Sequence, residues 1–243
     1  MMIDNNFHKL YLDYIKTIPY RSINIDFSNK CLLQCTYCDR QKPAGKDKVK
    51  RSSDMSFDDW KKILHTIPTS VHLCGQISDP IYHPDFIKFL EYASQNNNTV
   101  VHVHTTGTGK KRNFWNKVFS IKRRYRFIFG IDGLDQKTVN LHRIGQNFHQ
   151  SFKAMLLGAQ SHHRIVWQFI PFRHNEHQIE QAKDIAHKHN IRLMILKSNR
   201  WWPDSNVLIN NKLIKRDWIH PPSNPDLYVE WGKGKENKKE YYM

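Results

Sequence analysis

Short apolar runs alternate with longer amphipathic segments about six times between residues 20 and 200, and this alternation limits the possible folds strongly. The short runs are rich in β-branched and aromatic residues, as strands are, and the segments between them carry apolar residues at helical spacing. Repeats of this kind are typical of parallel βαβ units. The expected strands are 22–27, 70–74, 99–104, 125–131, 165–171 and 191–196, and the expected helices are 56–66, 84–95, 112–119, 147–162 and 176–189.

The sequence therefore predicts an α/β fold, a partial (β/α)6 TIM-type barrel of parallel strands with an irregular C-terminal tail. We expect an N-terminal segment (1–20), a core domain (21–200) and the tail (201–243), in which Pro, Asn and Lys replace the periodic pattern. Trp218, Tyr228 and Trp231 are the tail residues expected to pack on the core, and the last dozen residues are expected to be mobile.

The composition describes a globular chain, with 39 % apolar and 25 % charged residues among 243. No apolar run approaches the ~18 residues that a membrane span needs, and the N-terminus has no signal-peptide pattern. We therefore expect a cytoplasmic protein without a membrane partner. The net charge of +16, concentrated in 42–51 and 110–126, is compatible with a nucleic-acid partner. A composition biased toward Lys, Asn and Ile explains the charge equally well.

Three cysteines, Cys31, Cys35 and Cys38, form a C-x3-C-x2-C pattern directly after the first expected strand. Loops that follow strands form the functional face of β/α folds. Clustered thiols in such a chain indicate a metal site rather than disulfides. Three thiolates can ligate three irons of a cubane cluster and leave the fourth iron open to a cofactor.

Two other interpretations of the cysteines fit their spacing less well. A structural zinc site uses four Cys or His ligands, usually in paired knuckles, and the nearest candidates (His8, His65 and Cys74) lack that spacing. A redox pair of Cys35 and Cys38 leaves Cys31 unexplained. Cys74 is expected to be a small core residue, with a catalytic thiol as the alternative.

With Tyr37 next to its last cysteine, the triad resembles that of the radical S-adenosylmethionine (SAM) superfamily. Five further segments resemble motifs of that family in the same order, over roughly residues 20–200. Cys74–Pro80 and the following His83-Pro84 are similar to the family's GGEP and hPdf motifs. Thr105–Thr108 is similar to the TNG motif, Gly130–Leu134 to SIDGL and Leu141–Gly145 to yRig. Trp167–Glu176 is similar to a stretch of peptide-modifying enzymes that carry a SPASM extension.

The resemblance implies a [4Fe–4S] cluster on Cys31, Cys35 and Cys38, with SAM bound at the open iron. It also implies reductive cleavage of SAM to a 5′-deoxyadenosyl radical that abstracts hydrogen from a substrate. Asp79 stands where Glu is commoner, and Thr106 where Asn is. No cysteine follows Cys74, so we expect a single cluster. The SAM contacts implied are Gly75, Asp79, Pro80, Thr106, Asp132, Arg143 and Gln168.

The resemblance implies an enzyme of oxidoreductase or transferase type, with an electron donor such as flavodoxin or ferredoxin. We favour a peptide substrate; a nucleic acid, a nucleotide precursor or a small molecule are alternatives. A different class of function is a non-catalytic metal-binding module that contacts nucleic acid through basic segments and aromatic stacking.

Overall fold

Six parallel strands form one sheet in the computed structural model. The structure describes residues 22–66, 70–74, 76–95, 99–198, 201, 206–209, 212–215 and 220–227. The strands lie in the order in which they occur in the sequence, and each pairs in parallel with the next. The predicted α/β class is confirmed. The strands are β1 (Ser22–Ile25), β2 (Ser70–Leu73), β3 (Val100–Thr105), β4 (Arg126–Gly130), β5 (Arg164–Phe169) and β6 (Arg192–Ile195).

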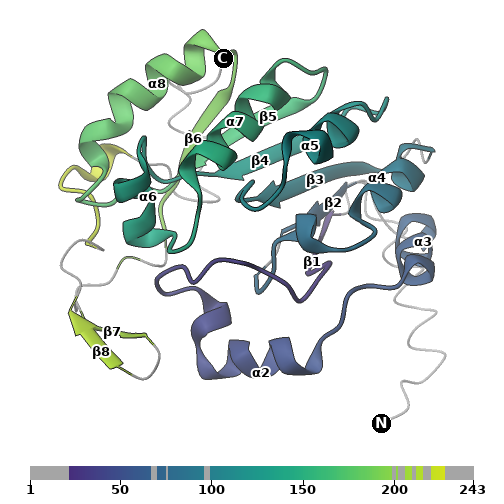
Figure 1. Ribbon diagram of the computed structural model, residues 1–243, viewed down its shortest axis with the longest axis horizontal. Helices are drawn as coiled ribbons and strands as arrows, with labels where there is room; N and C mark the ends of the chain where they lie inside the picture. Colours follow the sequence, from purple (N-terminus) through teal and green to yellow (C-terminus); the bar gives the residue numbers. More distant parts are fainter. Residues whose placement is uncertain are drawn as a thin grey trace.

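The strand order decides where the helices lie. Right-handed crossovers between neighbouring parallel strands place every connecting helix on the same face of the sheet. Figure 1 shows α3, α4, α5, α7 and α8 along one side of the sheet, which we call the outer face, with α2 apart from them. The helices are α2 (Pro43–Arg51), α3 (Phe57–Thr66), α4 (Phe86–Gln95), α5 (Arg112–Phe119), α6 (Gln136–His142), α7 (Phe148–Ala159) and α8 (Ile179–Lys188).

The main hydrophobic core lies between the outer face and the helices. Successive strand residues point to opposite faces, so in β3 Val101 and Val103 enter this core with no exposed surface, whereas His102 and His104 point to the opposite, inner face. Phe127, Phe129 and Trp167 continue the outer layer on β4 and β5. The inner face is therefore the polar face of the sheet.

Two helices and a hairpin were not expected from the sequence. The α2 segment has no apolar stripe, and its buried residue is Gly45; α6 is short. The tail, expected to be irregular, contains the antiparallel strands β7 (Asn206–Ile209) and β8 (Lys212–Lys215). The tail aromatics Trp218, Tyr228 and Trp231, and residues 1–21, lie outside the described residues.

None of the helices in the described ranges combines the length and the apolar character needed to cross a membrane.

Candidate functional site

The segments that follow the carboxyl ends of the strands converge at one edge of the sheet. The cysteine loop follows β1, Asp79 and Pro80 follow β2, and Thr106 follows β3. Asp132 follows β4, and Gln168 is half-buried near the end of β5, in register with Gly130. Since catalytic residues of β/α barrels gather at this end, the predicted site residues lie where such a site belongs. Gly75 lies outside the described residues.

The cysteine loop is held by backbone hydrogen bonds on two sides. On one side, the Asp79 N–H donates to the Lys30 carbonyl at 2.9 Å. On the other, the N–H groups of Gln34 and Thr36 donate to the carbonyls of Ile144 and His142, each at 2.9 Å. The loop therefore spans from the end of β2 to the segment after α6.

Among the described residues none of the three cysteines of this loop forms a disulfide; Cys35 is buried, and Cys31 and Cys38 are partly buried. Tyr37 has a positive φ of 55°, and the Cys38 N–H donates to the Cys35 carbonyl at 3.2 Å. This tight turn keeps the backbones of the last two cysteines close together. The predicted triad thus stands on one short, fixed segment.

Burial above all, together with the Asp79 carboxylate, Cys35 and Cys38, raises the pKa of the Cys31 thiol to about 12, although a backbone hydrogen bond at Leu33 acts in the opposite direction. These interactions show that the three thiols and Asp79 are electrostatic neighbours. A thiolate at Cys31 therefore needs a nearby positive charge, which a metal supplies by displacing the proton. Among the described residues no three His, Cys, Asp or Glu side chains converge as a single ion requires; a cubane cluster instead distributes its thiolates over separate irons.

Asp79 is buried and joins the loop after β2 to the end of β3. Its Oδ2 accepts hydrogen bonds from the Thr105 hydroxyl at 3.0 Å, the Thr106 N–H at 2.8 Å and the Thr106 hydroxyl at 2.9 Å. Its Oδ1 accepts from the Ile81 N–H at 3.3 Å, at the start of the turn that Pro80 begins. Burial raises the pKa of Asp79, although these hydrogen bonds act in the opposite direction. The predicted residues Asp79, Pro80 and Thr106 form one unit.

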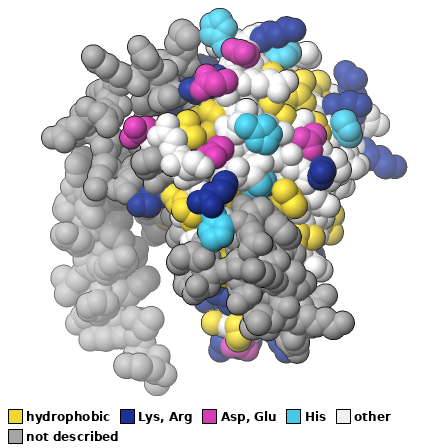
Figure 2. Space-filling view, turned by 90° about the vertical axis from the view of Figure 1, so that its left-hand side faces the viewer, with side chains coloured by type: hydrophobic (Ala, Val, Ile, Leu, Met, Phe, Trp, Pro, Cys, Tyr) yellow, Lys and Arg dark blue, Asp and Glu magenta, His cyan; other side chains and the backbone are white. Residues whose placement is uncertain are grey.

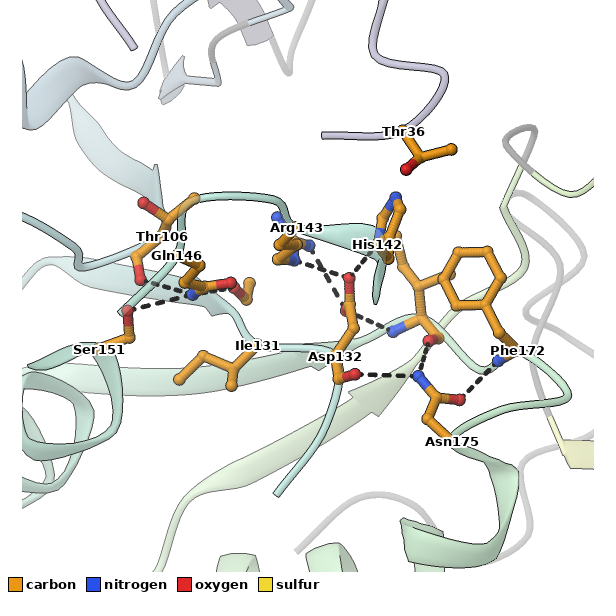
Figure 3. Close-up of polar contacts among 12 residues, drawn as sticks. Thr36, Thr106, Ile131, Asp132, His142, Arg143, Gln146, Ser151, Phe172 and Asn175 are labelled. Carbon is orange, nitrogen blue, oxygen red and sulfur yellow. Dashed lines mark hydrogen bonds and ion pairs between the residues drawn. The ribbon is translucent and has the colours of Figure 1, made fainter. Parts of the chain in front are cut away.

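Asp132 and Arg143 form a second unit, shown in Figure 3. The Asp132 carboxylate is fully buried and accepts from His142 Nδ1 at 2.7 Å, Arg143 Nε at 2.6 Å and the Ile170 N–H at 2.9 Å. Burial alone would raise the pKa of Asp132, but the Arg143 guanidinium and His142 hold it well below its usual range. Because the chain itself occupies this carboxylate, Asp132 orients Arg143.

Arg143 is buried between Asp132 and the cysteine loop. Burial lowers the pKa of Arg143, but Asp132 and then Cys35 and Cys38 outweigh burial and raise it. Its guanidinium also lies against Gly130, where an added Cβ would be 2.7 Å from Arg143 Nη2. The site therefore carries a fixed positive charge beside its cysteines.

Gln146 belongs to the site and was not expected from the sequence. Its Nε2 donates to the Thr106 carbonyl at 3.0 Å, the Gly130 carbonyl at 3.0 Å and Ser151 Oγ at 3.1 Å (Figure 3). Its Oε1 is buried without a hydrogen-bond partner among the described residues. A buried carbonyl oxygen without a donor is costly, so this atom is suited to a donor from a ligand. The sequence signal available was its place directly after Arg143-Ile144-Gly145.

The basic residues do not gather on the side of the molecule seen in Figure 2, where the described Lys and Arg side chains are interspersed with Asp and Glu. In α2, Arg51 pairs with Asp47, and Lys42, which precedes the helix, pairs with Asp39. Part of the charge of this basic segment is thus neutralised locally.

Comparison with known proteins gives similarity in structure but none in sequence: no protein-family description and no curated protein matches the chain. SuiB of Streptococcus suis is 16 % identical to this chain, with a TM-score of 0.63; the match covers 89 % of this chain and 49 % of SuiB. Structures of SuiB are also known with its precursor peptide SuiA and with S-adenosylmethionine. The enzyme anSMEcpe with bound AdoMet is 17 % identical with a TM-score of 0.56, over 74 % of this chain and 51 % of anSMEcpe. Methylornithine synthase PylB is 13 % identical with a TM-score of 0.55, over 81 % of this chain and 61 % of PylB.

These neighbours are radical SAM enzymes, one of them a peptide-modifying type, so the expected partial-barrel fold is confirmed. The chain spans about half the length of SuiB and of anSMEcpe.

Proposed function

We propose that the chain is a radical SAM enzyme that holds a [4Fe–4S] cluster on Cys31, Cys35 and Cys38. The observation that carries the proposal is the cysteine loop itself: three thiols lie on one segment, outside any disulfide among the described residues, and between Asp79 and Arg143 at the carboxyl ends of the strands. The shared fold with SuiB and anSMEcpe, both known with bound SAM, supports it.

When bound, the cluster supplies the electron that cleaves the sulfonium of SAM to methionine and a 5′-deoxyadenosyl radical, which abstracts hydrogen from the substrate. The chain's residues position and shield the reactants. Arg143, held by Asp132, offers its guanidinium to the carboxylate of SAM. For the amino group of SAM we propose Gly75, Asp79 and Pro80. Thr106, Gln146 and Gln168 provide polar groups for the rest of SAM.

For the substrate, we propose a peptide, because SuiB is known with its precursor peptide and anSMEcpe with peptides. A nucleic acid, a nucleotide precursor or a small molecule is the alternative, and the net charge of +16 is what favours a polyanion. The reaction needs a one-electron donor such as flavodoxin or ferredoxin. We also propose a cytoplasmic location, because glutathione and thioredoxin keep thiols reduced in that compartment.

The test is anaerobic reconstitution of the full chain with iron and sulfide. We expect about four iron atoms per chain, and formation of 5′-deoxyadenosine from SAM with dithionite. Replacing Cys31, Cys35 or Cys38 by alanine should abolish both, whereas Cys74→Ala, the matched control, should keep its iron. Iron bound equally by the triad variants, or zinc in place of iron, would refute the proposal.

A further inference from the structure

Acidic residues are nearly absent from the middle of the sequence. Residues 92–175 include 13 Lys and Arg but only two acidic residues, Asp132 and Asp135, so this segment carries +11 of the chain's net charge of +16. A general bias of composition toward Lys would spread the charge along the chain in proportion to length. The positive charge is instead concentrated in about a third of the chain, so a general bias does not explain it.

This acid-poor segment forms one continuous part of the fold. It contains β3, β4 and β5, which are neighbours in the sheet, and α5 and α7, which pack against each other (Figure 1). Asp132 and Asp135 both follow the carboxyl end of β4. The outer sides of α5 and α7 and the amino ends of β4 and β5 therefore include no acidic residue. Acidic residues return on the flanking helices, with Glu91 on α4 and with Glu180 and Asp184 on α8.

Six exposed cations lie on this part of the molecule, and we call them the basic surface: Arg112 and Lys117 on α5, Lys122 and Arg124 before β4, Lys153 on α7 and Arg164 at the start of β5. Within the described part of the chain, none of the six forms an ion pair.

The segments before β4 and β5 lie together. The Arg164 N–H donates to the Tyr125 carbonyl at 2.8 Å, directly beside Arg124 in the sequence. The ring of His162 lies 4.2 Å from that of His163 between centroids. Burial above all, and then His162 and Arg124, lowers the pKa of His163 to about 4, although backbone groups at the end of α5 act in the opposite direction. The end of α5 and the starts of β4 and β5 thus form one neighbourhood of positive charge.

The chemistry of the basic surface favours a nucleic-acid backbone over other partners. A protein partner would need an apolar centre in the interface, and a membrane surface would take up apolar side chains. The exposed large apolar residues of the described chain are Leu32 and Val100, and neither lies on α5, on α7 or in the segments before β4 and β5. Backbone phosphates need only Lys and Arg spread over a surface, because neutralising them releases bound counter-ions.

We propose that the basic surface binds nucleic acid through its phosphate backbone, independently of base sequence. Lys122, Arg124 and Arg164 precede or begin the strands whose carboxyl ends lead into the proposed cofactor site. Nucleic acid bound at the amino ends of these strands therefore leaves the cofactor site accessible. The inference goes beyond the proposed function and does not depend on it, because the basic surface includes no residue of that site.

The test is a fluorescence-anisotropy titration of the full chain with a labelled RNA duplex and with a DNA duplex of the same sequence, at several NaCl concentrations. We expect saturable binding that weakens steeply as the salt concentration rises. The combined variant Lys117→Gln, Lys122→Gln and Arg124→Gln should bind about tenfold or more weakly at ~0.1 M salt, and its slope of log K against log[NaCl] should be smaller by about two to three. The tighter of the two probes identifies the nucleic acid.

The matched control is the combined variant Lys46→Gln, Lys48→Gln and Lys50→Gln on α2. It removes the same charge from exposed lysines outside the basic surface. Its affinity and its salt slope should stay close to those of the wild type, since these lysines contact no bound phosphate. The comparison separates the position of the charge from the total charge of the chain.

Three results would overturn the inference: no saturable binding of either duplex at ~0.1 M salt, equal weakening in the two combined variants, or tighter binding to vesicles of phosphatidylcholine and phosphatidylserine than to both duplexes. If the first combined variant does not fold, Lys122→Gln alone should lower the salt slope by about one. A chain that binds nucleic acid here but forms no 5′-deoxyadenosine contradicts only the proposed function, and the reverse result contradicts only this inference.

Discussion

The guanidinium of Arg143 is held from two directions. Asp132 accepts a hydrogen bond from its Nε at 2.6 Å, and the missing side chain of Gly130 leaves the space that the guanidinium fills. A buried ion pair of this kind contributes little net stability by itself. Its value is geometric, because it fixes one charged group beside the cysteine loop.

Gly130→Ala tests this arrangement, since the new Cβ would lie 2.7 Å from Arg143 Nη2 and must displace it. We expect SAM affinity to fall about tenfold or more, the loss of one charged hydrogen bond, while overpacking costs about 1–3 kcal/mol of stability. Calorimetric SAM binding and urea unfolding measure the two effects.

Gly158→Ala is the matched control, because its Cβ would lie 2.8 Å from Ile165 and Phe119 in the core, away from the site. It should lose similar stability but keep SAM affinity. Equal SAM affinity in both variants would mean that Arg143 does not bind SAM.

At the level of single residues, part of the candidate site could be expected from the sequence. The triad could be proposed because its cysteines are close in the chain, and Asp79, Thr106 and Arg143 because of their motifs; the structure brings the segments that carry them to one edge of the sheet. The orienting role of Asp132 and the place of Gln146 were not, because they depend on tertiary contacts. Gln146 meets the carbonyl of Thr106, 40 residues away, a contact that no local pattern encodes.

Among the elements, the strands and outer helices were predicted well because burial imposes regular periods on them. The helices α2 and α6 were missed for a physical reason. The exposed α2 has no apolar stripe, and it approaches the preceding turn so closely that a Cβ on Gly45 would lie 1.8 Å from the Asp39 carbonyl oxygen. Packing of this kind, rather than hydrophobic pattern, determines where the segment lies.

The inner face of β3 gives the chain a pH dependence that can be measured in phosphate-free buffer. The pKa values of His102 and His104 are lowered to about 3 and about 4 by burial. Between pH 6.5 and 4 the unfolded chain therefore binds protons that the folded chain does not, and stability should fall as the pH falls through this window. Urea unfolding at several pH values measures the slope.

His102→Gln removes one of these groups and should flatten the slope, whereas His149→Gln, an exposed residue of α7, should leave it as in the wild type. If His102→Gln has the wild-type slope, its imidazole is not held neutral by the fold.

For the whole molecule, a singly wound parallel sheet places the helices that connect its strands on the outer face, so these connecting helices do not cover the inner face or the carboxyl ends of the strands. The proposed cofactor site lies at those ends, where the segments after β1, β2, β3 and β4 meet. No single sequence motif indicates this relation, since it depends on the parallel register of β2, β3 and β4.

The central claim is that three thiolates leave one iron open to SAM. The most direct measurement is the electron paramagnetic resonance spectrum of the reduced, reconstituted chain before and after SAM is added. We predict a [4Fe–4S] signal whose shape changes when SAM binds the open iron. A cluster signal that SAM leaves unchanged, or a chain that forms no cluster, would contradict the account.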